Sequence, residues 1–313
     1  MKTYLDCIPC FFRQALAAAR MSTDNQTIHR RVLNSVSTMI PDLALDVTPP
    51  EIAQKVYRMV YEITGNNDPY LEVKKCANTS AMTFYPHMKD IVDNSNETLE
   101  IACKLAIAGN AIDLGAQAEF GSIYSIIEDS VGYQLDQEQY RKFKESVGQS
   151  SLILYLADNA GEIVFDRILI EQLLQIKKSK IVFVVREKPI INDATLDDTL
   201  QVGLNKLATI ISNGSDAPAT ILSQCSPEML RYYRAADLII SKGQGNYESL
   251  SGRSENIFFL FKVKCRVIAR DSGLDVDSLV LARSTGRQEN IVTNSQQTQP
   301  EKRMGGSDQK FNV

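Results

Sequence analysis

The sequence predicts an α/β protein, in which a helical N-terminal domain precedes a doubly wound, mainly parallel three-layer α/β/α domain. Two observations support this fold class. Before residue 150, apolar residues recur at helical spacing and no run has the pattern of a strand. After residue 150, short apolar runs begin about every 29 residues, which is the length of a strand, a crossover helix and two connections.

The best-defined helix of the N-terminal part begins at Thr48-Pro49-Pro50-Glu51. Threonine can cap a helix, proline suits its first turn and an acid suits its positive end. Gly65 ends this helix, and Asn67-Asp68-Pro69-Tyr70 begins a second one that covers 71–82. Further helical segments are predicted at 10–20, 27–40, 97–108 and 137–147.

The second half contains five apolar runs that we interpret as strands. Strands that are apolar throughout are buried on both faces, as in a parallel sheet covered by helices. The predicted strands are Leu152–Leu156, Ile181–Val185, Thr209–Ser212, Leu238–Ser241 and Val267–Arg270, with helices at 162–176 and 226–235. We expect a helical domain at 1–147, an α/β domain of Rossmann-like type at 148–283 and a disordered tail at 284–313.

Composition excludes several partners. With 34 Lys and Arg against 38 Asp and Glu, the net charge is −4, which provides no basic surface for nucleic acid. No run approaches the ~18 apolar residues of a membrane span, and Asp6 and Arg13 interrupt any apolar signal-peptide segment. Six scattered cysteines suit a reducing compartment. We therefore expect a cytoplasmic protein without nucleic-acid or membrane partners, and predict no particular oligomeric state.

Polar residues follow the first predicted strand, where ligands of parallel sheets bind. Asp158 and Asn159 place two oxygen ligands side by side, and Gly161 lets backbone approach a ligand. Glu162 then begins an apolar helix, whose first N–H groups can face an anion. The alternative is that Asp158 and Asn159 cap this helix.

A further carboxylate follows the second predicted strand. Asp193 can meet Asp158 and Asn159 across neighbouring strand ends, which completes an oxygen set suited to Mg²⁺ or Mn²⁺. The alternative is that Asp193 caps a short helix running through Asp198.

The fourth predicted strand leads into a segment with two closely spaced glycines. This segment can wrap backbone around a small ligand, or it is an ordinary turn. Its residues are Gly243, Gln244, Gly245, Asn246 and Tyr247.

Three smaller features complete the candidates. Lys262 and Lys264 end an apolar run, where one of them can bind a phosphate or both can alternate into water at a sheet edge. On a strictly parallel sheet, a position just before the predicted fifth strand lies at the wrong edge. Asn110 and Asp113 can add polar groups from the helical part, and Cys7-x-x-Cys10 has no second pair at zinc spacing.

These residues occur in the order found in the metal-dependent damage-control phosphatase family, also known as domain of unknown function 89, which the chain resembles from residue 1 to about 283. The motifs that carry the resemblance are Cys7-x-x-Cys10, Gly109-Asn110-x-x-Asp113, Asp158-Asn159-Ala160-Gly161-Glu162, Asn192-Asp193, Lys242-Gly243-x-Gly245-Asn246-Tyr247-Glu248 and Lys262. The N-terminal C-x-x-C is typical of the mainly microbial branch. Where relatives carry Arg-Thr-x-Lys, this chain has Phe259-Leu260-Phe261-Lys262.

The resemblance implies a divalent-metal-dependent phosphatase that hydrolyses small phosphate monoesters, such as sugar phosphates or damaged phosphometabolites. It implies Mn²⁺, Mg²⁺, Co²⁺ or Ni²⁺ held by Asp158, Asn159 and Asp193, with Lys262 on the phosphate. The implied substrate-binding residues are Asn110, Asp113, Gly161, Glu162, Gly243, Gln244, Gly245, Asn246 and Tyr247.

Two mechanisms and two other functions remain open at this point. A metal-placed water can attack the phosphorus, or Asp158 can attack it and form an aspartyl-phosphate. The alternative functions are S-adenosylmethionine-dependent carboxyl methyl transfer and non-catalytic binding of a nucleotide or sugar phosphate.

Overall fold

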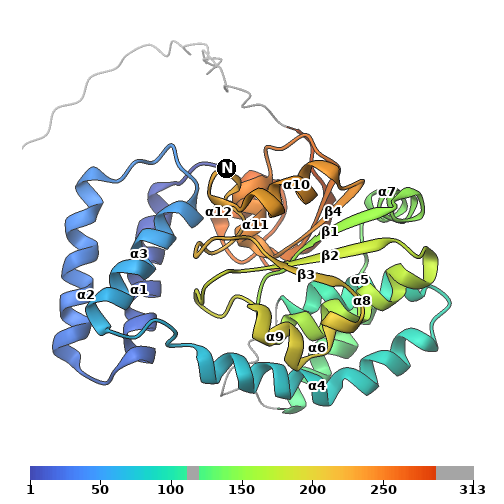
Figure 1. Ribbon diagram of the computed structural model, residues 1–313, viewed down its shortest axis with the longest axis horizontal. Coiled ribbons are helices and arrows are strands. Elements are labelled where there is room, and N and C mark those ends of the chain that lie inside the picture. Colours follow the sequence, from blue (N-terminus) through green and yellow to red (C-terminus); the bar gives the residue numbers. More distant parts are fainter. Residues whose placement is uncertain (111–119, 287–313) are drawn as a thin grey trace, which may run out of the picture.

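A six-stranded sheet forms the centre of the computed structural model, which describes residues 1–110 and 120–286 (Figure 1). The strand order is β3-β2-β1-β4-β5-β6; β1 to β5 run parallel and β6 pairs antiparallel with β5. The strands are β1 (Leu152–Leu156), β2 (Lys180–Val185), β3 (Thr209–Ser212), β4 (Leu238–Lys242), β5 (Ile257–Lys262) and β6 (Leu279–Arg283). Chain order reverses direction between β1 and β4, where ligands of such sheets bind.

The helices confirm most of the predicted segments, and the predicted fold class is confirmed. They are α1 (Ile8–Ser22), α2 (Gln26–Met39), α3 (Pro49–Thr64), α4 (Leu71–Asp93), α5 (Thr98–Gly109), α6 (Phe120–Gly132), α7 (Gln137–Gln149), α8 (Glu162–Ile176), α9 (Leu196–Gln201), α10 (Pro227–Ala235), α11 (Gly243–Leu250) and α12 (Arg266–Ser272). Helix α3 begins as expected, with the Thr48 N–H donating to Glu51 Oε2 at 2.7 Å, and ends at Gly65 with φ 72°.

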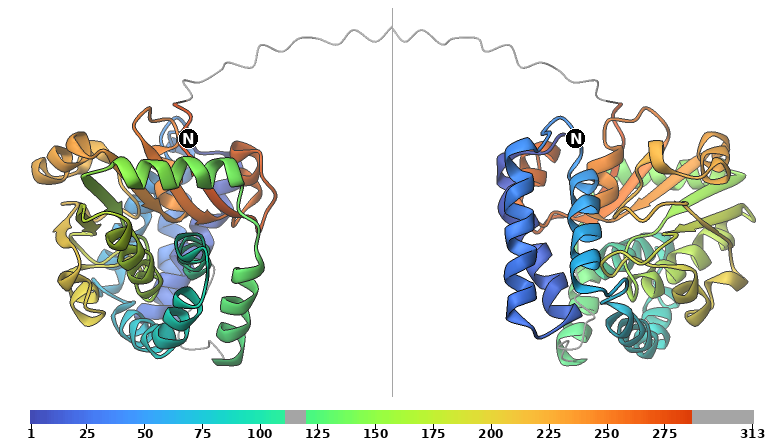
Figure 2. Two further views of the ribbon diagram at one scale, coloured as in Figure 1. Left: turned by 90° about the vertical axis from the view of Figure 1, so that its right-hand side faces the viewer. Right: turned by 60° about the vertical axis from the view of Figure 1, so that its left-hand side comes forward.

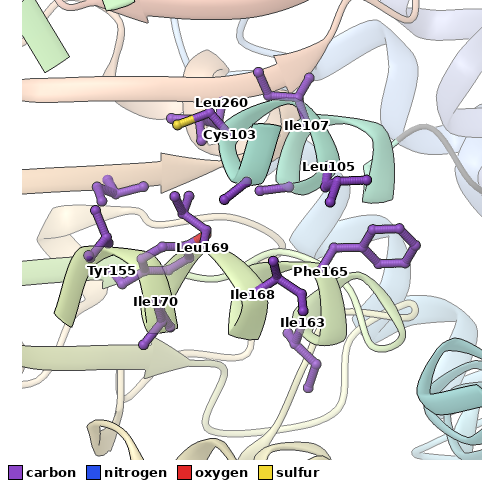
Figure 3. Close-up of a cluster of buried hydrophobic side chains, with 14 of the residues drawn as sticks. Cys103, Leu105, Ile107, Tyr155, Ile163, Phe165, Ile168, Leu169, Ile170 and Leu260 are labelled. Carbon is purple, nitrogen blue, oxygen red and sulfur yellow. The ribbon is translucent and has the colours of Figure 1, made fainter. Parts of the chain in front are cut away.

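Successive residues of each strand face opposite helical layers. Tyr155 belongs to the core formed with α5 and α8, whose apolar side chains interdigitate in Figure 3. Leu154 and Leu156 point into a second core on the other face, together with residues of α10, α11 and α12. The sheet is therefore covered on both faces, as its apolar strands predict.

The N-terminal helices divide into two groups. Helices α1, α2 and α3 have a core of their own, and they stand beside the sheet in Figure 1 and in the right view of Figure 2. Ile190 and Ile191, from the connection after β2, pack into that core. Apolar residues of α4 to α7 instead share the core of β1 and α8. One continuous core thus crosses residue 147, where we placed a domain boundary.

Two sequence predictions of secondary structure are wrong. Val267–Arg270 lies in α12 rather than in a strand: Val267 and Ile268 are buried while Arg266 and Arg270, four positions apart, are exposed. The fifth strand is instead β5, so Lys262 lies at the carboxyl edge of the sheet and not at the opposite edge.

Other elements extend or add to the predictions. Helix α4 continues past residue 82 and through Pro86, and the sequence analysis identified neither α6 nor β6. Of the expected tail, residues 287–313 lie outside the described part of the chain. None of the described helices has the length and apolar character that a membrane crossing requires.

Candidate active site

Backbone pairing brings the ends of β1 and β2 together beyond the sheet. Asn159 and Asp193 form an isolated antiparallel bridge. The Ala160 N–H donates to the Asn192 carbonyl and the Ala194 N–H donates to the Asp158 carbonyl, each at 2.8 Å. The structure therefore places Asp158, Asn159 and Asp193 side by side, as the sequence analysis expected.

Neither acidic residue caps a helix. The N-cap of α8 is Gly161, with φ 78° and no side-chain cap. The N-cap of α9 is Thr195, in a capping box with Asp198. Asp158 and Asp193 are thus held at the edge of the sheet by contacts other than the capping bonds that were their alternative explanation.

Two amide side chains connect the Asp158 carboxylate to that of Glu162. Asn110 Nδ2 donates to Asp158 Oδ2 at 2.8 Å and to Glu162 Oε2 at 2.9 Å. Asn159 Nδ2 donates to the same two oxygens at 2.9 and 3.0 Å. The Asn159 side-chain nitrogen is thus the atom that contacts both carboxylates, and its Oδ1 is not used in these two hydrogen bonds.

Gly243, the first residue of α11, lies directly against Asp158. A Cβ at this glycine would lie 1.9 Å from Asp158 Oδ2, and its φ of 79° is in the left-handed region. Both facts require glycine. Helix α11 also has no side-chain cap, so the N–H groups of its first turn remain available next to Asp158.

A buried charge network lies beneath these residues. The Lys242 ammonium contacts Glu162 Oε1 at 2.7 Å, Asp166 Oδ1 and the Ala106 carbonyl oxygen. The Tyr155 hydroxyl donates to Asp166 Oδ1 at 2.7 Å. Lys242, Glu162 and Asp166 are almost completely buried. Glu162 was expected to bind substrate. In the structure it contacts Lys242, Asn110 and Asn159 and so supports the residues around Asp158.

Asp193 forms a second buried ion pair. Arg186 Nε lies 2.7 Å from Asp193 Oδ2, and the two side chains are 1% and 5% exposed. Burial raises the pKa of Asp193, while Arg186 and a backbone hydrogen bond from Ala219 oppose this rise.

The site carries more negative than positive charge. Among residues 1–110 and 120–286, the carboxyl groups of Asp158, Glu162, Asp166 and Asp193 lie with two buried cations, Lys242 and Arg186.

Burial and the neighbouring charges shift the pKa values of the carboxyl groups. Burial, with the charges of Glu162 and Asp193, raises the pKa of Asp158 to about 8. Burial also raises the pKa of Asp166 to about 6, although Lys242 opposes it. Burial acts in the same direction on Glu162, but Lys242 and Asn110 outweigh it and lower that pKa. A divalent cation at Asp158 would relieve this repulsion.

The donor chemistry suits such a cation. Within residues 1–110 and 120–286, no three His, Cys, Asp or Glu side chains form a cluster that could hold a metal ion. A cation at this edge would therefore need the Asn159 amide oxygen beside the carboxylates of Asp158 and Asp193. Two carboxylates and one amide oxygen suit a hard divalent cation that keeps several waters.

The two lysines at the end of β5 differ in their partners. Lys262 Nζ lies 2.8 Å from Asp277 Oδ1, and the Lys262 N–H donates to Asn110 Oδ1 at 3.3 Å. The exposed Lys264 acts electrostatically on Asp158 and lowers its pKa against the larger effect of burial. The charge of Lys264 thus acts on Asp158, whereas Lys262 pairs with Asp277.

The remaining candidates in α11 make contacts within the protein. Asn246, fully buried, donates from Nδ2 to the carbonyls of Lys242 and Ala157. The Tyr247 hydroxyl donates to Asp271 Oδ2 at 2.9 Å. Gln244 Nε2 donates to Glu248 Oε1 at 2.9 Å. Gly245 packs near Ala219. This segment is a helix rather than a loop wrapped around a ligand.

The start of α8 offers less to an anion than expected. The Gly161 N–H donates to Asn78 Oδ1 at 2.7 Å, and the Ile163 N–H donates to the Asn159 carbonyl at 3.3 Å. Asp113 lies outside the described residues. Cys7 and Cys10 are free, half-buried thiols.

Sequence reasoning missed Arg186, Lys242 and Asp166 as parts of the site. A signal exists for the first two, because Arg186 directly follows the buried strand β2 and Lys242 is the last residue of the buried strand β4. Such a position is costly unless the charge has a buried partner.

The fold and the site together define an α/β protein with an acidic, amide-containing centre beside the ends of β1, β2 and β4. Residues 3–280 match the family described as the damage-control phosphatase ARMT1-like domain. The chain therefore belongs to the damage-control phosphatase family, and this membership supports a phosphatase activity.

Named relatives agree with this assignment. A damage-control phosphatase of Pyrococcus horikoshii is 33% identical, with 91% of this chain and 99% of the relative covered. One from Archaeoglobus fulgidus is 32% identical, with 88% and 96% covered. The crystal structure of a DUF89 family protein from Pyrococcus horikoshii superposes with a TM-score of 0.83 at 32% identity and covers 91% of this chain and 99% of that chain.

Proposed function

We propose that this protein is a divalent-metal-dependent phosphatase that hydrolyses small phosphate monoesters, such as sugar phosphates or damaged phosphometabolites. The observation that carries the proposal is the backbone bridge between Asn159 and Asp193, which joins Asp158 and Asn159 to a second carboxylate at the edge of the sheet. The surplus of negative charge there favours a cation.

In this proposal Asp158, Asn159 and Asp193 hold the metal, for which Mn²⁺, Mg²⁺, Co²⁺ and Ni²⁺ are the candidates. A bound divalent cation supplies a Lewis acid for a phosphoryl oxygen and stabilises the charge that develops during phosphoryl transfer.

The chain's own groups then bind and orient the phosphate. The uncapped first turn of α11 presents backbone N–H groups beside Asp158, and helix N-termini favour anions. Lys264 adds a positive charge on the β5 side of Asp158. A phosphate between these groups is contacted by donors and by a cation, which stabilise its equatorial oxygens.

Helix α3 contacts the connection that carries Asp193. The Tyr61 hydroxyl, on α3, accepts a hydrogen bond from the Ile191 N–H at 3.3 Å, two residues before Asp193. In this proposal the substrate is a small phosphorylated metabolite rather than a phosphoprotein.

Hydrolysis of p-nitrophenyl phosphate after chelation tests this proposal. We expect chelated protein to be inactive, added Mn²⁺ to restore turnover, and Asp158→Ala to reduce turnover at least 100-fold. Glu138→Ala, at an exposed position of α7, is the matched control and should behave as the wild type. Undiminished activity after chelation would reject metal dependence.

Two further measurements address the substrate and the alternative functions. A screen of phosphorylated metabolites against the four metals should identify a substrate that is hydrolysed faster than p-nitrophenyl phosphate. Calorimetric titration with S-adenosylmethionine without metal should give no binding heat. Tight binding in that titration would instead favour methyl transfer.

A further inference from the structure

We propose that Arg186 is a positioning residue that fixes the direction of the Asp193 carboxylate relative to the end of β1 at the metal site. The inference rests on the proposed metal role of Asp193. Arg186 touches neither substrate nor reacting atoms; it acts through Asp193 and through the backbone at the end of β1.

One planar group connects both halves. Arg186 Nε donates to Asp193 Oδ2 at 2.7 Å, and Arg186 Nη2 donates to the Ala157 carbonyl at 3.3 Å. Ala157 directly precedes Asp158. The guanidinium holds its nitrogens in a fixed fork, so it sets the direction of the Asp193 carboxylate relative to the Asp158 backbone. A lysine has one charged nitrogen and no such fork.

The location of this contact argues against a role in stability alone. Arg186 is one of the largest fully buried side chains of the molecule. A buried ion pair is weak evidence for stability, because well-packed apolar residues of similar volume often do as well or better. A buried arginine that contacts a candidate ligand and the backbone beside another is better explained by the geometry it imposes.

The connection that carries Asp193 also needs outside support. Ile191 has φ 47°, an uncommon and strained conformation for a β-branched residue. Its N–H is held by Tyr61 of α3, and Asp193 itself is held by Arg186 and the Ala219 backbone. The direction of the Asp193 carboxylate therefore depends on its partners rather than on the loop.

Arg186→Lys tests the role, with Arg167→Lys as a matched control. Arg167, on α8, makes the same kind of double contact: its Nε donates to Glu171 Oε1 at 3.1 Å and its Nη1 donates to the Val202 carbonyl at 2.9 Å. The measurements are the Mn²⁺ dissociation constant of the full chain by calorimetry and the melting temperature without metal.

We expect Arg186→Lys to raise the Mn²⁺ dissociation constant at least tenfold, because loss of a partner that orients a metal ligand typically costs 10- to 100-fold in affinity. Arg167→Lys should leave it unchanged, even where its melting temperature falls as far as that of Arg186→Lys. A metal affinity of Arg186→Lys equal to the wild type would overturn the inference.

Asp193→Asn separates this inference from the proposed function. If the wild type binds no Mn²⁺, or if Asp193→Asn binds it as the wild type does, the proposed metal role fails and the inference fails with it. If Asp193→Asn loses binding and Arg186→Lys keeps it, only the inference fails. Arg186→Gln is the second variant, and failure of both Arg186 variants to fold would show a purely structural role and also overturn the inference.

Discussion

Replacing Gly243 by alanine should disable the site while the fold survives. An alanine Cβ would lie 1.9 Å from Asp158 Oδ2 and 2.3 Å from its Cγ, whereas Cβ contacts under 3.0 Å essentially do not occur. The Asp158 carboxylate must therefore move by about 1 Å or more, and a displacement of that size can cost on the order of 100-fold in rate. The left-handed φ of 79° adds about 1–2 kcal/mol of backbone strain.

Two other glycines separate these effects. Gly273 has φ 73° and no atom within 4 Å of an added Cβ, so Gly273→Ala carries the backbone strain alone. A Cβ at Gly245 would lie 3.2 Å from Ala219 Cβ, and the Ala219 backbone is a hydrogen-bond partner of Asp193, so this close contact acts on the other half of the site.

The assays are metal-dependent turnover of p-nitrophenyl phosphate and thermal unfolding. Gly243→Ala should lose about 100-fold in turnover, while Gly273→Ala should lose only stability, roughly 2–4 °C in Tm per kcal/mol of strain. Gly245→Ala should lower turnover less than Gly243→Ala, because its close contact reaches Asp193 only through Ala219. Wild-type turnover in Gly243→Ala would refute the placement of Asp158 at the reacting centre.

Three further outcomes follow from the charges. Lys264→Ala should raise KM for a phosphate ester about tenfold and Lys262→Ala should leave it within about twofold, because the charge of Lys264 acts on Asp158 whereas Lys262 pairs with Asp277. Steady-state kinetics of both variants would show the opposite order if Lys262 binds the phosphate. Because the pKa of Asp158 is about 8, protons compete with the metal, so calorimetry should show Mn²⁺ affinity rising about tenfold per pH unit from pH 6 to 8 and levelling off above; a flat profile contradicts this. Burial raises the pKa of Glu248 to about 7, so the folded state binds this proton more tightly than the unfolded state and stability falls as pH rises through the window up to about 7. In urea unfolding at pH 5 and pH 8, the wild type should lose about 1–2 kcal/mol of its free energy of unfolding, after allowance for the partial exposure of Glu248, and Glu248→Gln should not. Equal losses in both proteins would contradict this expectation.

The sequence predicts the sheet well where its pattern has one interpretation. The runs at 152–156 and 238–241 are apolar, flanked by turn signals and too short for helices, and both are central strands. The run at 267–270 has only four residues, and such a run fits a strand and a helical turn equally well. The regular spacing favoured the strand. In the structure, the adjacent residues Val267 and Ile268 are the buried residues of helix α12.

The candidate ligands were predictable from the sequence, and the residues that support them were not. Asp158 and Asn159 follow β1 and Asp193 lies in the connection after β2, and parallel topology brings these segments to one edge of the sheet. The choice between Lys262 and Lys264 depends on the direction of each side chain at the end of β5. The fifth strand was predicted at 267–270 instead, so the sequence could not settle this choice. Lys242 pairs with Glu162 across 80 positions, so this pairing depends on packing between distant segments, whereas Arg186 pairs with Asp193 within the connection after β2.

The docking of Ile190 and Ile191 into the core of α1 to α3 has a consequence for anyone who dissects this protein. Asp158, Asn159 and Asp193 all follow residue 157, yet the conformation of the connection that carries Asp193 is imposed by helices from the first 64 residues. A fragment comprising only the sheet and its later helices would retain every candidate ligand and still lack the template that shapes the β2 connection. Minimal catalytic versions of this chain must therefore keep its N-terminus.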